Sequence, residues 1–277
     1  MATQELIVAG RDGTRIAVGV DGEGPPIVLL HGLTATRRYV VMGSSVLQRS
    51  GLRVVRYDAR GHGASSPAPE PSAYTYALLA EDLRAVLDSL DIERAALAGA
   101  SMGAHTAIRF ALDHPERVSG LGLITPAFDP DAPIEPDAYE GWDRLARGLR
   151  DGGVEGFVAA NTLDAVPARW RETIETVLRQ RLSAHEHPLA VADALEFIPR
   201  SRPFERMAQL REIGAPTIVV GSRDQADPGH PLAIAERYAA AIDGAEMIVE
   251  DEGPPARSPI AWQGGRLSKA LVGLFES

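Results

Sequence analysis

The stretch Ala95-Ala96-Leu97-Ala98-Gly99-Ala100-Ser101-Met102-Gly103 decides how this chain of 277 residues is expected to fold. Its first four residues are apolar without alternation, which is typical of a strand buried on both faces of a sheet. A helix is expected from about Met102 to Leu112. A serine between a strand and a helix, with glycine two residues before and two after, predicts a sharp turn that lifts its hydroxyl clear of the sheet.

Further apolar runs lie on both sides of this stretch. Strands are expected at residues 27–30, 53–57, 121–124, 216–220 and 246–249, after a hairpin over residues 6–20. Helical patterns fall between several of these runs, as at residues 77–90 and 232–242. Buried strands that alternate with helices predict the α/β class, with a mostly parallel sheet covered by helices on both faces.

One segment breaks this alternation. Between about Thr125 and Leu210 the sequence has no strand-like run, and its apolar residues have helical spacing between prolines and glycines. We therefore expect a core formed by residues 1–125 and 211–277, with a helical insertion at residues 126–210. Aromatic residues of this insertion, such as Trp142 and Trp170, are candidates either for its own core or for a pocket wall.

Composition restricts the classes of function. The formal net charge of −10 and the pI near 5.2 argue against nucleic-acid and anionic-membrane partners, which favour clustered Lys and Arg. The absence of cysteine excludes disulfides and a cysteine nucleophile. We expect a cytoplasmic protein, because the first residues do not resemble a signal peptide. We also expect it to act on a small molecule, and the sequence implies no metal or organic cofactor. The sequence leaves open whether it forms a homo-oligomer.

Ser101 is the expected nucleophile. A helix N-terminus carries partial positive charge, which favours an anion that develops beside the serine. The run His31-Gly32-Leu33-Thr34 follows a predicted strand, and its glycine allows a backbone turn that aims an N–H at a substrate oxygen. We expect the amides of Leu33 and Met102 to form an oxyanion hole, and His31 to hold this loop by hydrogen bonds.

An acidic residue follows the strand at residues 216–220. Asp224, in Gly221-Ser222-Arg223-Asp224, stands where a carboxylate can orient an imidazole and stabilise its charge. Asp227 is close enough in sequence to compete for this role. The alternative is that Asp224 belongs to an ordinary surface loop.

These motifs together resemble the α/β-hydrolase superfamily. Besides the serine turn, they are His31-Gly32, Asp58-x-Arg60-Gly61-His62-Gly63-x-Ser65, His114-Pro115-Glu116-Arg117-Val118 and Gly221-x-x-Asp224. The resemblance implies an eight-stranded α/β-hydrolase sheet and a serine hydrolase, most often one that cleaves carboxylic esters. It also implies that residues 126–210 form the family's helical cap over the active site.

The chain departs from this superfamily at the catalytic base. The family's histidine normally follows the last strand in a Gly-His pair, but here the pair is Gly253-Pro254 and no histidine comes later. His230, just beyond the acidic loop, is the candidate replacement. Weaker candidates are His105, which we expect to pack beneath the serine turn, and His185 and His187, which we expect at polar surface positions.

Three functions remain open from sequence. The first is a serine hydrolase that acts on a small or medium apolar carboxylic ester through Ser101, with Asp224 and His230. The second is a non-hydrolytic lyase or cyclase, and the third is a ligand-binding protein. The last two are considered because the usual histidine is absent and a serine without a base is a poor nucleophile.

Overall fold

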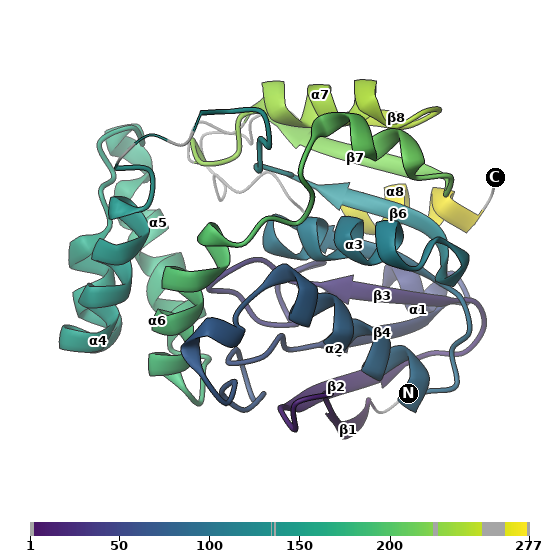
Figure 1. Ribbon diagram of the computed structural model, residues 1–277, viewed down its shortest axis with the longest axis horizontal. Coiled ribbons are helices and arrows are strands. Elements are labelled where there is room, and N and C mark those ends of the chain that lie inside the picture. The colour runs from purple at the N-terminus through teal and green to yellow at the C-terminus, as the bar shows by residue number, and fades with distance from the viewer. Residues whose placement is uncertain (1–2, 134, 136, 224–226, 251–263, 276–277) are drawn as a thin grey trace.

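The computed structural model describes residues 3–133, 135, 137–223, 227–250 and 264–275, and they form a three-layer α/β structure (Figure 1). Within this part of the chain, eight strands form one sheet in the order β1-β2-β4-β3-β5-β6-β7-β8, so the predicted fold class is confirmed. The strands are β1 (Gln4–Ala9), β2 (Arg15–Asp21), β3 (Pro26–Leu30), β4 (Arg53–Tyr57), β5 (Ala95–Ala100), β6 (Val118–Ile124), β7 (Thr217–Ser222) and β8 (Glu246–Glu250).

The direction of the strands brings several loops together. β1 and β2 pair antiparallel, as do β2 and β4, whereas β4, β3, β5, β6, β7 and β8 run parallel. The carboxyl ends of parallel strands meet at the same edge of a sheet, where open α/β sheets bind their ligands. The loops after β3, β5, β6 and β7 therefore lie at this edge.

Helices cover both faces of the sheet. One face carries α2 (Tyr76–Ser89), α3 (Met102–Asp113) and α7 (Leu232–Ala241), and the other carries α1 (Val46–Arg49) and α8 (Gly264–Val272). Short 3-10 helices are η1 (Pro71–Ala73), η2 (Pro115–Arg117), η3 (Ile198–Arg200), η4 (Met207–Glu212) and η5 (Gly273–Phe275).

Strand β5 explains why the sheet is buried on both sides. Side chains alternate between the two faces of a strand. Leu97 accordingly packs in the apolar layer beneath α3, whereas Ala96 and Ala98 pack in the layer beneath α8. All three are almost fully inaccessible to solvent. Burying a leucine side chain of this kind contributes about 1.5–3 kcal/mol, so the strand that leads to Ser101 is held firmly from both faces.

The segment between β6 and β7 is helical. It contains α4 (Glu140–Ala160), α5 (Ala168–Leu182) and α6 (Pro188–Phe197), which lie beyond the carboxyl edge of the sheet (Figure 1). We call the segment of residues 126–210, which contains these helices, the insertion. Residues of all three helices share an apolar cluster of their own, and a further cluster joins α6 to the core through residues such as Ala190, Ala194 and Ile198.

Candidate active site

The turn at Ser101 has a strained backbone. Ser101 lies in the left-handed region, with φ 50° and ψ −112°, and is the N-cap residue of α3. A Cβ on Gly99 would lie 2.2 Å from the carbonyl carbon of Gly103, and one on Gly103 would lie 2.1 Å from the carbonyl oxygen of Leu30. Neither position has room for a side chain. The strain at Ser101 is therefore imposed by close backbone packing around it.

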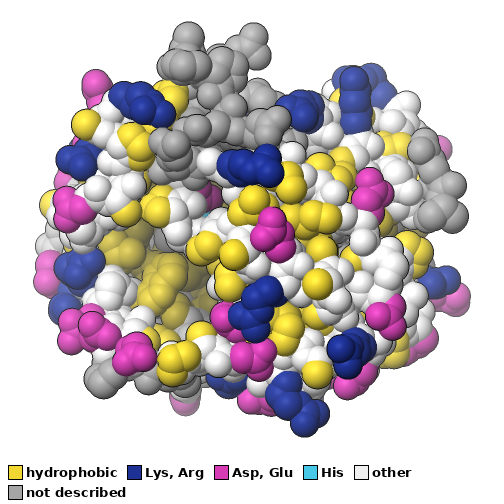
Figure 2. Space-filling view, turned by 90° about the horizontal axis from the view of Figure 1, so that it is seen from above, with side chains coloured by type: hydrophobic (Ala, Val, Ile, Leu, Met, Phe, Trp, Pro, Cys, Tyr) yellow, Lys and Arg dark blue, Asp and Glu magenta, His cyan; other side chains and the backbone are white. Residues whose placement is uncertain are grey.

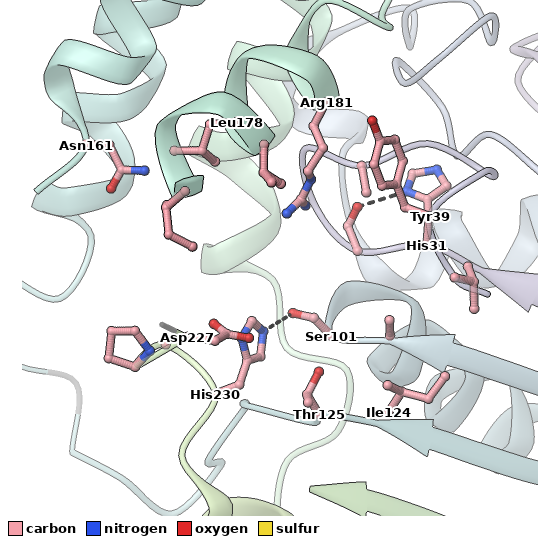
Figure 3. A pocket seen from close by; sticks show the side chains of 18 of the residues that line it. His31, Tyr39, Ser101, Ile124, Thr125, Asn161, Leu178, Arg181, Asp227 and His230 are labelled. Atoms are coloured by element: carbon pink, nitrogen blue, oxygen red, sulfur yellow. Dashed lines mark hydrogen bonds and ion pairs between the residues drawn. The ribbon is translucent and has the colours of Figure 1, made fainter. Parts of the chain in front are cut away.

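Ser101 is hydrogen-bonded to a histidine that is supported by a carboxylate (Figure 3). The Nε2 atom of His230 lies 2.9 Å from Ser101 Oγ, and its Nδ1 atom lies 2.7 Å from Asp227 Oδ1. One tautomer satisfies both bonds, with Nδ1–H donating to Asp227 and Nε2 accepting from the serine hydroxyl. This is the arrangement of a nucleophile, a general base and a carboxylate that orients the base.

Asp227 and His230 come from the same short loop between β7 and α7. They are three residues apart, and the backbone N–H of His230 donates to the carbonyl of Asp227 at 3.2 Å. Burial opposes ionisation of Asp227. The hydrogen bond and charge of His230 and the charge of Arg181 outweigh burial, so the pKa of this carboxyl lies below its usual value. Asp227 is therefore ionised at neutral pH and able to stabilise a charged imidazole.

The structure brings together only some of the site residues predicted from sequence. It places His230 against Ser101, and it pairs His230 with Asp227, the competitor of Asp224. Asp224 lies outside the described residues, as does Pro254, which stands where the family has its histidine. The signal that could have favoured Asp227 is its spacing, because residues three apart in a turn can contact each other.

The loop after β3 lies beside Ser101. A Cβ on Gly32 would be 3.6 Å from Ser101 Cβ. His31 Nδ1–H donates to the carbonyl of Gly32 at 2.9 Å, while its Nε2 accepts from the Ala59 N–H at 2.9 Å. Burial lowers the pKa of His31 to about 4, so the ring is neutral and keeps both bonds. His31 thereby fixes the peptide that carries the Leu33 N–H, and it holds the loop as expected.

His105 and His185 are also buried. His105 lies beneath the serine turn, where its Nε2 accepts from the N–H groups of Ala127 and Phe128 at 3.2 Å each. Burial lowers its pKa to about 3, so this ring stays neutral and is occupied by structural contacts. The expected polar surface position of His185 is wrong. Only 9% of it is exposed, because it bridges the insertion to loops of the core.

A cavity of about 360 Å³ opens beside Ser101 and His230, between the carboxyl edge of the sheet and the insertion. Figure 2 shows a hollow with hydrophobic side chains on the side of the molecule that carries the insertion. Trp142 and Trp170 are outside the wall of the cavity, since Trp142 is exposed and Trp170 packs against Val166. The apolar side chains of the wall are Ala35, Val40, Met42, Ala100, Ile124, Leu163, Val166, Ile174, Val177, Leu178 and Leu267.

Comparison with known proteins supports the class that this fold and site define. The family model of the alpha/beta hydrolase fold matches residues 25–254. A 2-hydroxy-6-oxononadienedioate/2-hydroxy-6-oxononatrienedioate hydrolase from Pseudomonas putida is 32% identical over 234 residues, which cover 82% of this chain and 80% of the relative. The chain therefore belongs to the alpha/beta hydrolase fold family and is a hydrolase of that fold.

Solved structures agree with this assignment. The enol-lactonase from Burkholderia xenovorans LB400 superposes with a TM-score of 0.78 at 25% identity, covering 98% of this chain and all of that chain. A thermophilic esterase from Thermogutta terrifontis also gives a TM-score of 0.78 at 25% identity, over 99% of this chain and 98% of that chain.

Among the helices that the structure describes, none is long and apolar enough to cross a membrane.

Proposed function

We propose that this protein is a serine hydrolase in which Ser101, His230 and Asp227 form the catalytic triad. Ser101 Oγ attacks the carbonyl carbon of an ester while His230 takes the serine proton and then gives it to the departing alkoxide. Water, deprotonated by the same histidine, then attacks the carbonyl carbon of the acyl-enzyme. The bond to Ser101 Oγ breaks, the acid leaves, and the histidine returns the proton to Ser101 Oγ. The observation that carries this proposal is the continuous chain of hydrogen bonds from Ser101 through His230 to Asp227, at 2.9 and 2.7 Å.

The oxyanion of the tetrahedral intermediate is assigned to the amides of Leu33 and Met102. Met102 is the first residue of α3, so its N–H belongs to the unpaired N-terminal turn of that helix. The Leu33 N–H lies on the opposite side of its trans peptide from the Gly32 carbonyl that His31 holds. A donor of this kind contributes about 10²–10³-fold to the rate in related chemistry.

The substrate class follows from the cavity. Its wall is mainly apolar and its volume of about 360 Å³ suits a small or medium acyl or alcohol group. A carboxylic ester, open or cyclic, is consistent with the names of the esterase and the enol-lactonase that the chain resembles. We propose that residues 126–210 act as a cap, because Leu163, Ile174 and Leu178 from this segment form part of the wall.

The alternatives from sequence lose their main support. A lyase, a cyclase or a ligand-binding protein was considered because Pro254 replaces the usual histidine. His230 offers Ser101 a base from a neighbouring loop of the same sheet edge. The proposal therefore needs no residue after β8 for proton transfer.

The test is hydrolysis of p-nitrophenyl acetate, butyrate and octanoate by the wild type and by Ser101→Ala. We expect wild-type turnover that favours the shorter acyl groups, and loss of turnover in Ser101→Ala. Ser183→Ala is the matched control, because Ser183 is an exposed serine at the end of α5. Turnover that persists in Ser101→Ala, or folded wild-type protein that leaves all three esters intact, would contradict the proposal.

A further inference from the structure

Arg181, near the end of α5, reaches from the insertion to the loop after β3 (Figure 3). Its Nη2 atom donates to the carbonyl of Leu33 at 3.1 Å and to Thr34 Oγ1 at 3.0 Å. Its guanidinium carbon lies 5.9 Å from the centre of the Tyr39 ring. The side chain thus contacts the loop that carries one of the two proposed oxyanion donors, 148 positions away in sequence.

The loop that Arg181 holds is strained. Thr34 has a φ of 68°, a left-handed conformation that a β-branched residue rarely adopts. Such a conformation persists only where surrounding contacts impose it. The insertion supplies two of these contacts, since His185 Nε2 also hydrogen-bonds to the Thr34 carbonyl at 3.0 Å. Release of these contacts would allow Thr34 to relax and the loop to move.

The two peptide groups on either side of the Leu33 Cα are held separately. His31, from the core, holds the carbonyl of Gly32, and Arg181, from the insertion, holds the carbonyl of Leu33. Together these two bonds restrict rotation about both backbone bonds of Leu33. The direction of the Leu33 N–H therefore depends on the core and the insertion together.

The guanidinium of Arg181 is a buried positive charge near Asp227. Its Nε atom is buried and has no hydrogen-bond partner among the residues that the structure describes. Burial lowers its pKa, opposed by the charge of Asp227. Burying a cation in a largely apolar wall is costly, and the charge-assisted hydrogen bonds of Arg181 to the loop offset part of this cost.

We propose that Arg181 is a positioning residue that couples the insertion to the oxyanion hole. It holds the Leu33 carbonyl and Thr34, and so keeps the Leu33 amide aimed at the substrate oxygen while the insertion is seated on the core. This inference rests on the proposed serine hydrolase function. It assigns to the insertion a part in the chemical step as well as in the shape of the cavity.

The test compares Arg181→Met and Arg181→Lys with the wild type on p-nitrophenyl butyrate, a neutral ester with no charge for Arg181 to bind. We expect kcat of Arg181→Met to fall about 10–100-fold, a part of what an oxyanion donor contributes, with KM within about threefold. Arg181→Lys should recover part of the loss, because an ammonium group can reach only some of the acceptors. The rate of fluorophosphonate labelling of Ser101 should fall with kcat.

Arg179→Met is the matched control. Arg179 lies two residues away on the same helix, is exposed, and pairs with Glu155 and Glu175 rather than with the core. Its kcat should equal that of the wild type. A loss in Arg181→Met that appears only in KM would assign Arg181 to substrate binding and overturn the inference, as would an unchanged kcat. If Arg181→Met does not fold, an unchanged kcat in Arg181→Lys decides against the inference.

The two proposals fail in different ways. Wild-type protein that does not turn over the ester through Ser101 would contradict the serine hydrolase function itself. Turnover that depends on Ser101 but not on Arg181 would overturn only the coupling between the insertion and the oxyanion hole.

Discussion

The turn after β5 carries the proposed nucleophile and the loop after β7 carries the proposed base, yet the two segments are built differently. At the turn, the backbone is enclosed by other backbone, so that no side chain fits at Gly99 or Gly103. In the loop, the nearest atom of the described residues to a Cβ on Gly229 would be Asp227 Oδ1 at 3.9 Å, and 24% of the His230 side chain is exposed. Ser101 is thus placed by close backbone packing, whereas His230 is placed by the hydrogen bonds of its side chain.

This difference suggests that the position of the histidine can vary more than that of the serine. The strained conformation of Ser101 depends on packing among β3, β5 and α3, so the serine can occupy few other positions in this fold. A base needs only to reach the serine from the carboxyl edge of the sheet, where the loops of neighbouring parallel strands meet. A histidine after β7 meets this requirement, although the superfamily usually places it after β8.

The largest effect is expected from removing the base. His230→Ala should lower kcat/KM for p-nitrophenyl butyrate about 10⁴–10⁶-fold, because the members of a triad act as a unit. For the same reason, the double variant with Ser101→Ala should be no worse than either single variant. His114→Ala, at the opposite end of α3 from Ser101, is the control and should keep full activity. A loss of less than about tenfold in His230→Ala would mean that the base lies elsewhere.

A somewhat smaller effect is expected at the carboxylate. Asp227→Asn should lower kcat about 10³–10⁴-fold, because an amide favours the wrong tautomer of His230 and cannot stabilise its charge. Asp224→Asn separates the two candidate acids and should keep most of the activity. If steady-state kinetics show a larger loss of kcat in Asp224→Asn than in Asp227→Asn, then Asp224 is the carboxylate that supports the base.

The contrast between the two loops predicts different effects on stability. Gly103→Ala should lower the free energy of unfolding by about 3 kcal/mol or more, since its Cβ meets the Leu30 carbonyl. Gly229→Ala should change it by less than about 1 kcal/mol, because the position has space and no positive φ. Urea denaturation of both variants measures the difference, and equal losses would show that the β7 loop is as tightly packed as the serine turn.

The last prediction concerns the dependence of stability on pH. Burial lowers the pKa of His31 to about 4 and that of His105 to about 3, from a usual value of 6.5. Between pH 6.5 and 4 the unfolded chain therefore binds more protons, and the free energy of unfolding should fall by up to about 1.4 kcal/mol per pH unit for each histidine. Urea denaturation at several pH values should show this slope. His105→Gln should reduce it, and an unchanged slope in that variant would contradict the buried neutral state of His105.

The fold and the strained turn at Ser101 could be predicted from sequence because both depend on local patterns. The apolar run at residues 95–98 and the flanking Gly99 and Gly103 specify a strand and a turn that few other structures accommodate. The carboxylate that pairs with His230 was harder to predict from sequence. Asp224 and Asp227 follow the same strand, and only a spatial arrangement distinguishes them. The contact of Arg181 with Leu33 spans 148 positions and has no sequence motif. Burial of His185 likewise depends on how the insertion packs against the core.

Activation of Ser101 by His230 can be tested by covalent labelling of the serine. The protein is exposed to a fluorophosphonate, and the adduct is quantified by intact-mass spectrometry and mapped by peptide digestion. We expect one adduct per chain on Ser101 in the wild type, and much slower formation of this adduct in folded His230→Ala. No adduct on folded wild-type protein, or labelling of His230→Ala at the wild-type rate, would contradict it.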